Sequence, residues 1–474
     1  MRAQVILAGG SHKHTDLSLT AQRTINFFPQ RQEAGNEKSP YILESFYGLK
    51  PFAASSGLNR GIYAHLEILY VLLGTTLSSV SSAGVLTTLG TIPGDGRAVF
   101  EGIGTSIVIV ADGVAYSWDG TTFSTASDTD FETPNAVTVI NNQALYDGDN
   151  GRFAVSDVGQ PLVINALNFG TAESRADSLL RPYRNNTVIY MFGSKTVETW
   201  WNDGQGNPPF TRIEDGTIEI GLEAIHSIAS DDQLIYFLGD DHQVYALSGT
   251  VPVALLPLTI VRDIRKFAIR SDAVAWTMQI DSQWFYVIKF PSADRTFVYP
   301  RPPKSLADRG VKGDWFELSS GVNGARYSGD GYAFVYGKHL VPDEGGNILE
   351  LDEETYTENT AVIKRTRVMA PIHAGLYGQP GKKLYIAFLR LLGATGTGLL
   401  AGQGTNPQVM LRYSQDGENF SNEIRGDVGK LGTRTEIIFE LGETFETWVF
   451  EITSTDPVYS NWHSASIEVE VAIE

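Results

Sequence analysis

A hairpin-like pattern recurs along this chain and constrains its fold more than any other feature. Residues 188–201 (VIYMFGSKTVETWW) combine a β-branched and aromatic run, a break at Gly193-Ser194-Lys195, and a second run with alternating polar and apolar residues. This order predicts two antiparallel strands joined by a tight turn. Segments of the same plan begin at residues 69, 107, 144, 188, 234, 284 and 332, so successive starts lie 37 to 50 residues apart. Seven hairpins at this interval predict a seven-bladed β-propeller.

Sequence on both sides of the hairpins can supply the remaining strands of four-stranded blades. Candidate strands precede the first and fifth hairpins, at 60–63 and 223–229. Candidate outer strands follow the first, fifth and sixth hairpins, at 85–89, 251–256 and 314–318. Helical periodicity of any length is not found. The predicted hairpins themselves are 69–80, 107–118, 144–155, 188–201, 234–247, 284–299 and 332–351.

The hairpin rhythm divides the chain into three parts. Residues 1–50 lack the rhythm, and we expect this segment to close the propeller by supplying a strand that covers an open sheet edge. Residues 51–360 carry the repeats. Residues 361–474 contain alternating strand-like pieces joined by turns, which predict a C-terminal β-sandwich. With 48 glycines and 51 aromatic residues, the composition also favours an all-β fold.

Composition excludes several kinds of function. The formal net charge of −19 argues against sequence-independent binding to nucleic-acid phosphates. The chain has no cysteine, which excludes disulfides and thiolate metal sites. No window approaches eighteen consecutive apolar residues, so we expect no membrane span. The short apolar run after Met1-Arg2 does not predict a signal peptide, so synthesis in a cytoplasm is expected.

A few polar clusters could bind a metal, but each has a simpler interpretation. His12-Lys13-His14 with Asp16 could supply ligands, because side chains two apart on a strand share a face; the simpler interpretation is a mobile polar segment. Asp231-Asp232 and Asp240-Asp241-His242 could hold calcium, although aspartates favour such turns because they cap backbone N–H groups. We predict no metal site and no cofactor site.

No motif places catalytic residues. Gly393–Gly404 is rich in glycine but lacks the following Gly-Lys-Ser/Thr of a phosphate-binding loop, so a flexible loop is predicted. Ser414–Phe420 resembles the Asp-box turn of sialidase-type propellers, but it is one residue short and lies outside the repeats. A glycosidase also needs two facing carboxylates, which no motif supplies. The tryptophans are interpreted as blade packing or, alternatively, as exposed interface anchors; they are Trp200, Trp201, Trp276, Trp284 and Trp315.

The order of several landmarks resembles that of a known family. The landmarks are Asn26-Phe27-Phe28-Pro29, 41–49 (YILESFYGL), Asn59-Arg60-Gly61, 192–198 (FGSKTVE), 221–227 (GLEAIHS) and a final strand ending at Ile473-Glu474. In this order the chain resembles, over nearly its whole length, the packaged-DNA stabilization proteins of short-tailed bacteriophages, also called tail accessory or tail hub proteins. The terminal portions depart most from the family pattern.

The resemblance implies a structural role in the virion tail. Such proteins form six-fold rings below the portal and its adaptor ring, help to close the channel after packaging, and contact a tail needle or plug and tailspikes or fibres. DNA would pass through the channel without specific binding, since acidic walls repel it. We expect the Gly- and Pro-rich loops 202–209 and 300–313 to be docking surfaces. The alternative from another class is a carbohydrate-binding or glycoside-cleaving propeller.

Overall fold

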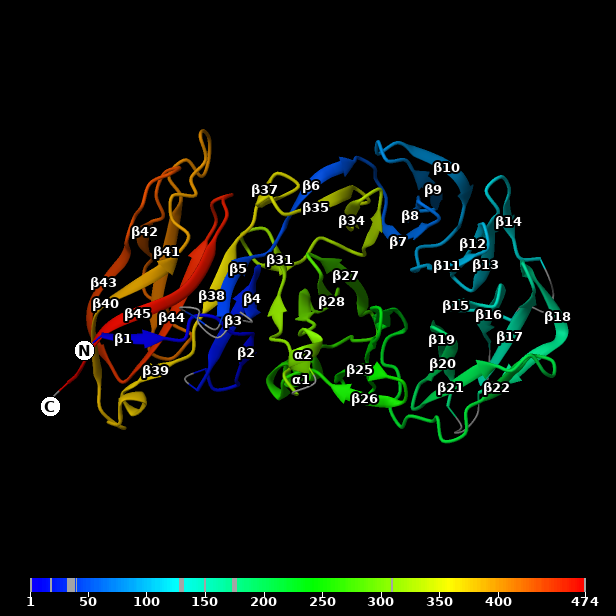
Figure 1. The fold of residues 1–474 in the computed structure, drawn as a ribbon, viewed down its shortest axis with the longest axis horizontal. Coiled ribbons are helices and arrows are strands. Elements are labelled where there is room, and N and C mark those ends of the chain that lie inside the picture. Colours follow the sequence, from blue (N-terminus) through cyan, green and yellow to red (C-terminus); the bar gives the residue numbers. More distant parts are fainter. Residues whose placement is uncertain are drawn as a thin grey trace.

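The regular secondary structure of the protein is almost entirely β-strand, which confirms the predicted all-β class. The computed structural model describes residues 2–17, 19–31, 39, 41–127, 132–148, 151–172, 177–307 and 310–472. Figure 1 shows a ring of sheets at one end of the elongated molecule and two broad sheets at the other end, where both termini lie.

Five four-stranded antiparallel sheets follow one another along the chain in the part that the structure describes. Within each sheet the strands pair in sequence order, as a meander. The first two sheets are β7 (Asn59–His65), β8 (Ile68–Leu73), β9 (Thr76–Val80) and β10 (Leu86–Thr91), then β11 (Val99–Ile103), β12 (Ser106–Ala111), β13 (Val114–Trp118) and β14 (Phe123–Thr125). The third and fourth are β15 (Val137–Ile140), β16 (Gln143–Asp147), β17 (Arg152–Asp157) and β18 (Gln160–Thr171), then β19 (Leu179–Asn185), β20 (Val188–Gly193), β21 (Val197–Asn202) and β22 (Phe210–Arg212). The fifth is β23 (Ala229–Ser230), β24 (Ile235–Leu238), β25 (Val244–Ser248) and β26 (Val251–Ala254).

Two further meanders belong to larger sheets. One is β27 (Val274–Ile280), β28 (Gln283–Phe290), β29 (Arg295–Pro300) and β30 (Phe316–Glu317). The other is β33 (Ala333–Val335), β34 (Lys338–Pro342) and β35 (Ile348–Asp352), and its outer neighbour is β6 (Gly48–Ala53), from before the first sheet. Strand β6 runs antiparallel to β35, with Gly48 opposite Asp352 and Ala53 opposite Ile348. The short pieces β36 (Thr357–Glu358) and β37 (Ala361–Val362) extend this sheet, and β31 (Ser319–Ser320) pairs with β32 (Ala325–Arg326).

Apolar side chains hold the successive sheets together in a ring. Tyr70 and Leu72 of β8, for example, share a buried core with Ile107 and Ile109 of β12 in the next sheet. Comparable cores join each later sheet to the one after it. The last core closes the circle, because it combines side chains of β8 with those of β34 and β35. Each sheet therefore buries both of its faces against neighbours.

The predicted hairpins coincide with paired strands of these meanders. Residues 188–201 form β20 and β21, with Val188 opposite Trp201. The segment 332–351 contains three strands instead of two, and residues 149–150 of the 144–155 hairpin lie outside the described residues. The 3₁₀ turn Ile225–Ser227 takes the place of part of the strand expected over 223–229.

The expectation that no helix occurs was wrong between β26 and β27. Helix α1 (Leu258–Arg265) follows Pro257, buries Ile260, Val261 and Ile264, and exposes Arg262 and Arg265. Its apolar positions extend over only two turns, too short a stretch for a helical period to stand out in the sequence. A second helical piece, α2 (Lys304–Ala307), is a single turn.

The remaining strands form two sheets that face each other across one core. The first has the order β4 (Phe27–Arg31), β5 (Tyr41–Ser45), β45 (Asn461–Val471), β40 (Leu384–Gly393) and β43 (Ile437–Phe445), with β1 (Arg2–Val5) also on β45. The second continues from β30 through β3 (Ala21–Ile25), β38 (Arg365–Val368), β44 (Thr447–Ser454), β41 (Gln408–Ser414) and β42 (Ile424–Asp427). Strand β2 (His12–Lys13) pairs with β3, and β39 (Ile372–His373), which precedes the 3₁₀ turn Ala374–Tyr377, pairs with β44. Their common core includes Trp448 and Trp462.

The closing strand expected from residues 1–50 is β6, at the end of this segment, which pairs with β35. The other early strands join the two remaining sheets, since β1 and β5 pair with β45, and β3 pairs with β38 and also with β30 of the ring. The early strands thereby cover edges of the C-terminal strands that would otherwise be open. The final strand expected to end at Ile473-Glu474 is β45 up to Val471; the last two residues lie outside the described part.

A buried carboxylate joins the ring to these two sheets. Glu317 of β30 accepts hydrogen bonds from Arg23 Nη2 and Arg295 Nη2, both at 2.7 Å, and from Ser11 Oγ at 3.0 Å. Only 5% of its side chain is exposed. Burial alone would raise the pKa of Glu317, but the two arginines and the hydrogen bonds outweigh burial and lower the pKa to about 2.

The lowered pKa of Glu317 makes the folded state less stable as the pH falls. Because its pKa in the folded protein lies below the usual 4.5, Glu317 stabilises the folded state above pH 4.5, and this contribution is lost as the pH falls towards 2. We expect Glu317→Gln to lower the free energy of unfolding at pH 7 by about 3 kcal/mol and to flatten its decline between pH 4.5 and 2. Urea unfolding of both proteins at pH 7, 4 and 3 measures this. Parallel pH profiles would contradict it.

Candidate functional site

A cleft of about 810 Å³ lies between the N-terminal strands and the ring of sheets. One wall is the end of β4 with Tyr41 at the start of β5, and the opposite wall is the turn between β27 and β28. The third wall is Pro300–Lys304 with residues 311–314, which belongs to the loop predicted as a docking surface. Residues 308–309 of this loop lie outside the described part.

The loop 300–313 is held to the ring by specific bonds. Arg301 Nη1 donates to Asp231 Oδ2 and Asp232 Oδ1, both at 2.8 Å, and Arg301 Nη2 donates to Gln233 Oε1 at 2.7 Å. Lys312 Nζ donates to the Ala254 carbonyl at 2.6 Å. Prolines 300, 302 and 303 fix backbone dihedrals on the same wall. The described part of the loop is therefore fixed to the ring at both ends and loses little conformational freedom on binding.

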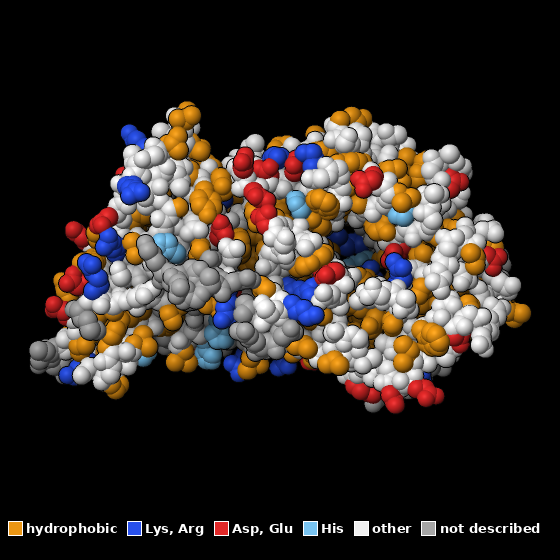
Figure 2. Space-filling model, viewed as in Figure 1, with side chains coloured by type: hydrophobic (Ala, Val, Ile, Leu, Met, Phe, Trp, Pro, Cys, Tyr) orange, Lys and Arg blue, Asp and Glu red, His pale blue; other side chains and the backbone are white. Residues whose placement is uncertain are grey.

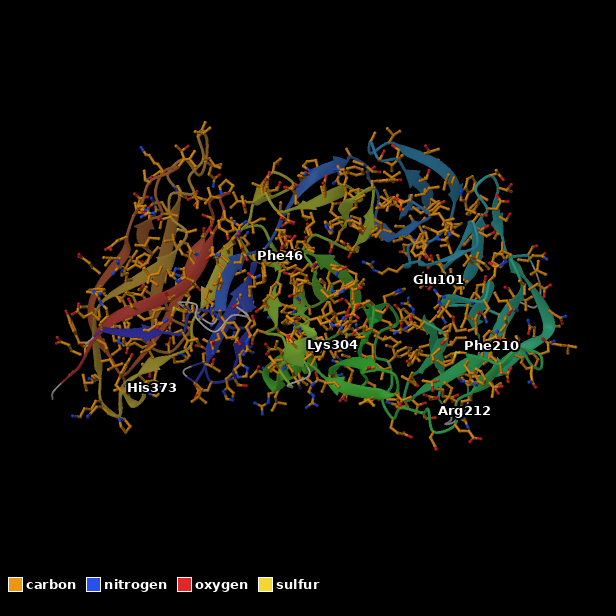
Figure 3. All side chains as sticks on the ribbon, viewed as in Figure 1. Phe46, Glu101, Phe210, Arg212, Lys304 and His373 are labelled. Carbon is orange, nitrogen blue, oxygen red and sulfur yellow. The ribbon has the colours of Figure 1, made fainter. Side chains whose placement is uncertain are left out.

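The cleft combines aromatic walls with charges of both signs. Phe28 packs against Phe46 and Phe285 in edge-to-face geometry, and Figure 3 shows Phe46 where the N-terminal strands meet the ring and Lys304 on α2. Burial raises the pKa of Asp314 in the third wall. Such a mixture suits a segment of another protein with apolar and charged side chains.

The second predicted docking loop, 202–209, projects from the fourth sheet between β21 and β22. Residues 204–207 are exposed, and Trp201 beside them is 48% exposed. Asp203 holds the base of the loop, because its side chain accepts hydrogen bonds from the Gln205 N–H at 2.8 Å and the Thr211 hydroxyl at 2.6 Å. A firm base with an exposed tip fits a contact surface.

The structure does not bring the metal candidates together. His12 and Lys13 lie exposed on β2, which is a paired strand and not a mobile segment, and His14 Nδ1 accepts a hydrogen bond from the Asp16 N–H at 3.0 Å. Among the residues that the structure describes, no group of three or more histidine, aspartate or glutamate side chains could hold a metal ion.

The aspartates at turns cap the backbone, as the sequence suggested. Asp231 Oδ1 accepts from the N–H groups of Gln233 and Leu234 at 2.8 and 2.7 Å. Asp240 Oδ1 accepts from the Gly221 N–H, and Asp241 Oδ1 accepts from the Gln243 N–H. These hydrogen bonds account for the positions of the three carboxylates without a bound calcium ion.

The glycine-rich segment and the segment that resembles an Asp-box are a loop and a turn in the structure. Residues 394–404 form a loop between β40 and β41, as predicted. In the turn after β41, Asp416 Oδ1 accepts from the Ser414 hydroxyl and the Asn419 N–H, each at 2.8 Å, and Gly417 packs on Leu17, which precedes β3. The turn thus supports the N-terminal strands.

The tryptophans divide between the two interpretations. Trp276 and Trp315 are buried, and Trp315 Nε1 donates to the Leu255 carbonyl at 3.1 Å. Trp200 packs edge-on against Phe153 at 5.2 Å. Trp284 lines the cleft, and Trp201 is exposed beside the 202–209 loop. The first three are packing residues, and the last two are available as interface anchors.

A polar group at the centre of the ring was missed in the sequence. It includes Tyr63, Glu101, Arg181 and His226, which lie on or next to innermost strands. The sequence does contain an indication of this group, because charged residues recur just before the predicted hairpins. At these positions the first strand of each meander faces the centre of the ring. These charged residues were not recognised as one group, because the hydrophobic patterns of the inner strands are weaker than those of the hairpins.

Comparison with known proteins identifies a matching family model. Residues 3–356 match the model described as bacteriophage P22 Gp10, β-propeller. No curated protein matches the sequence. No helix in the described residues is long and apolar enough to cross a membrane.

Solved β-rich structures show only a general likeness. The WD40 β-propeller domain of Doa1 is 11% identical with a TM-score of 0.41, and 64% of this chain and 97% of that chain are covered. BamB from Moraxella catarrhalis is 9% identical with a TM-score of 0.38, and 74% and 97% are covered. The computationally designed Ika8 protein is 10% identical with a TM-score of 0.39, and 70% and 99% are covered.

Proposed function

The chain belongs to the bacteriophage P22 Gp10 β-propeller family, and from this we propose that it is a tail hub below the portal and adaptor ring that closes the head–tail channel and retains packaged DNA. The family is one of phage structural proteins and not of enzymes, which removes the glycoside-cleaving alternative. The family match over residues 3–356 is the observation that carries the proposal.

The proposed architecture is a seven-bladed propeller with a β-sandwich beside it. Five meanders, the β27–β30 meander and the β33–β35 meander completed by β6 supply the blades. The sandwich takes β1 to β5 from one end of the chain and β38 to β45 from the other. We therefore place the propeller at about residues 48–362 and make the second domain discontinuous.

The proposed assembly is a hexameric ring in the virion tail, made in the host cytoplasm. Its expected partners are the portal–adaptor ring, a tail needle or plug, and tailspikes or fibres, with DNA passing through the channel without specific binding. The 810 Å³ cleft and the exposed 202–209 loop are the proposed contact surfaces, since both are rigid at their base. Ring closure requires contacts between two different surfaces of neighbouring copies.

The proposal predicts a defined defect in particles made without the protein. Heads should assemble and package DNA, then lose it after packaging ends, because a portal alone leaves the channel open. DNA content per particle and infectivity, measured with and without the protein, test this. Imaging of intact tails should show six copies. A matched variant lacking only residues 204–206 should fold but join fewer particles, since the deletion leaves every sheet intact.

Two outcomes would contradict the proposal. Heads without the protein that retain their DNA and still accept the other tail proteins would rule out the retention role. A copy number other than six would rule out the hexameric ring but leave the retention role standing. The carbohydrate-binding alternative would be examined next in the first case, with a glycan array.

A further inference from the structure

A small polar cavity lies at the centre of the propeller. Its volume is about 180 Å³, and its polar lining comes from inner strands and the segments before them: Tyr63, Arg97, Arg181, His226, Asp330 and Tyr332. Figure 2 shows this side of the molecule hollowed inside the ring of sheets, with lysine or arginine and histidine side chains in the hollow. The concentration of cations is notable in a chain with a net charge of −19.

Arg181 of β19 has hydrogen-bonding capacity that the described protein does not use. Its Nη1 donates to the Ile225 carbonyl at 2.8 Å, and its guanidinium carbon lies 5.5 Å from the centre of the Tyr183 ring. Its Nε is buried and has no acceptor. Within the described ranges, no carboxylate is close enough to Arg181 to form an ion pair. A guanidinium carries five N–H donors, so Arg181, which lines the cavity, keeps further N–H groups that can donate to a ligand there.

The other groups around the cavity do not neutralise Arg181. Arg97 is already paired with Asp330, whose carboxylate also accepts from Lys289 Nζ at 3.2 Å. Burial, with the nearby charges of Arg181 and Arg97, lowers the pKa of His226 to about 3. His226 is therefore neutral at pH 7, and it offers hydrogen bonds without adding charge.

We propose that the central cavity binds one small oxyanion, with Arg181 as its main ligand and His226 and Tyr63 beside it. A guanidinium presents paired N–H donors that match phosphate and carboxylate oxygens. A volume of about 180 Å³ corresponds to about six waters at ~30 Å³ each, so it has room for phosphate or a small carboxylate. The anion is either free phosphate or a carboxylate.

Glu101 opposes this anion electrostatically. It lies on β11 at the inner side of the ring (Figure 3), where Arg181 and Arg184 act on its charge without forming an ion pair with it. Burial raises the pKa of Glu101 to about 7, and the two arginines act in the opposite direction. An anion at Arg181 and a charged Glu101 compete for the same positive potential.

The test is calorimetric titration of the full-length protein with inorganic phosphate and, separately, acetate, at constant ionic strength set with sodium chloride. We expect saturable binding of one anion per chain. Arg181→Gln should weaken it about 10- to 100-fold, because a charged hydrogen bond is lost. Glu101→Gln should strengthen it. The matched control is Arg212→Gln, because Arg212 is exposed on the outermost strand of the same sheet (Figure 3) and should bind like the natural protein.

The two anions distinguish the source of the ligand, and two results would overturn the proposal. Tighter phosphate binding identifies phosphate as the preferred ligand, and tighter acetate binding identifies a carboxylate. The proposal is wrong if neither anion binds saturably to the natural protein, or if Arg181→Gln and Arg212→Gln bind equally well. Because Glu101→Gln should act in the opposite direction, the site stays testable even if Arg181→Gln fails to fold. The result does not depend on a role in the tail.

Discussion

Asp330→Asn is expected to lower the free energy of unfolding of the propeller by about 3–5 kcal/mol, since it breaks a buried ionic network. The Asp330 side chain is 3% exposed and pairs with Arg97 and with the fully buried Lys289. It also accepts from Asn59 Nδ2 at 3.1 Å. These partners belong to the first, second and sixth meanders, so one carboxylate next to β33 connects four of the sheets. Asparagine keeps the shape of the side chain but removes the negative charge that pairs with Arg97 and Lys289.

Urea unfolding with a matched control measures the effect. Asp352→Asn in β35 removes a carboxylate of the same domain whose partner, Lys50, is 39% exposed, so it should cost less than about 1 kcal/mol. Adding Lys289→Met to Asp330→Asn should restore part of the loss, because the buried cation is removed as well. Equal midpoints for Asp330→Asn and Asp352→Asn would show that the network does not hold the ring closed.

Arg367→Met is expected to release the N-terminal segment from the two C-terminal sheets and to lower stability by about 3–5 kcal/mol. The Arg367 side chain is completely buried in β38. Its Nε donates to the Leu7 carbonyl at 2.6 Å, and its Nη1 donates to the Gly9 and Gly10 carbonyls at 3.1 and 3.2 Å. Burial lowers the pKa of Arg367 to about 10, so it is still charged at pH 7. Methionine would leave those carbonyls buried without a donor.

Hydrogen exchange of residues 2–10 gives the local readout for this variant. Protection should fall there first, while the inner strands of the propeller keep theirs. Arg367→Lys should lose nearly as much protection at residues 2–10 as Arg367→Met, because an ammonium cannot reproduce the planar set of donors. The control is Arg425→Met, an exposed arginine of β42 in the same sheet. Unchanged protection of residues 2–10 in Arg367→Met would contradict the assignment.

The hairpins could be read from the sequence because both of their strands are buried. Residues 188–193 and 234–238 are runs of β-branched and aromatic residues that only a strand inside a stack of sheets accommodates. The inner strand β23, of only two residues, carries no such pattern, whereas β30 lies within the outer strand predicted over 314–318. Helix α1 was not predicted for a related reason, since its apolar face extends over only two turns. The C-terminal partners of β1, β3 and β5 could not be inferred, because pairing across more than 300 residues leaves no local signal.

The candidate surfaces were predictable only in part. The Pro-rich composition of 300–313 marked a loop, but its bonds through Arg301 to the turn at Asp231 required the fold. The central group around Arg181 was missed because its members come from separate meanders. Such a site is assembled by ring closure and is absent from any single stretch of sequence.

The pairing of β6 with β35 sets an order for biosynthesis. The two strands are about 300 residues apart, so at about 5–20 residues per second β6 waits roughly 15–60 s for its partner to be made. Strands β3 and β5 wait longer still, for β38 and β45. Until then several strand edges stay open on the nascent chain, with the slow, non-local folding that such pairings entail. A ribosome that stops before residue 352 releases a product in which neither the ring nor the two C-terminal sheets are complete, so neither part of the fold can finish before the other has most of its strands.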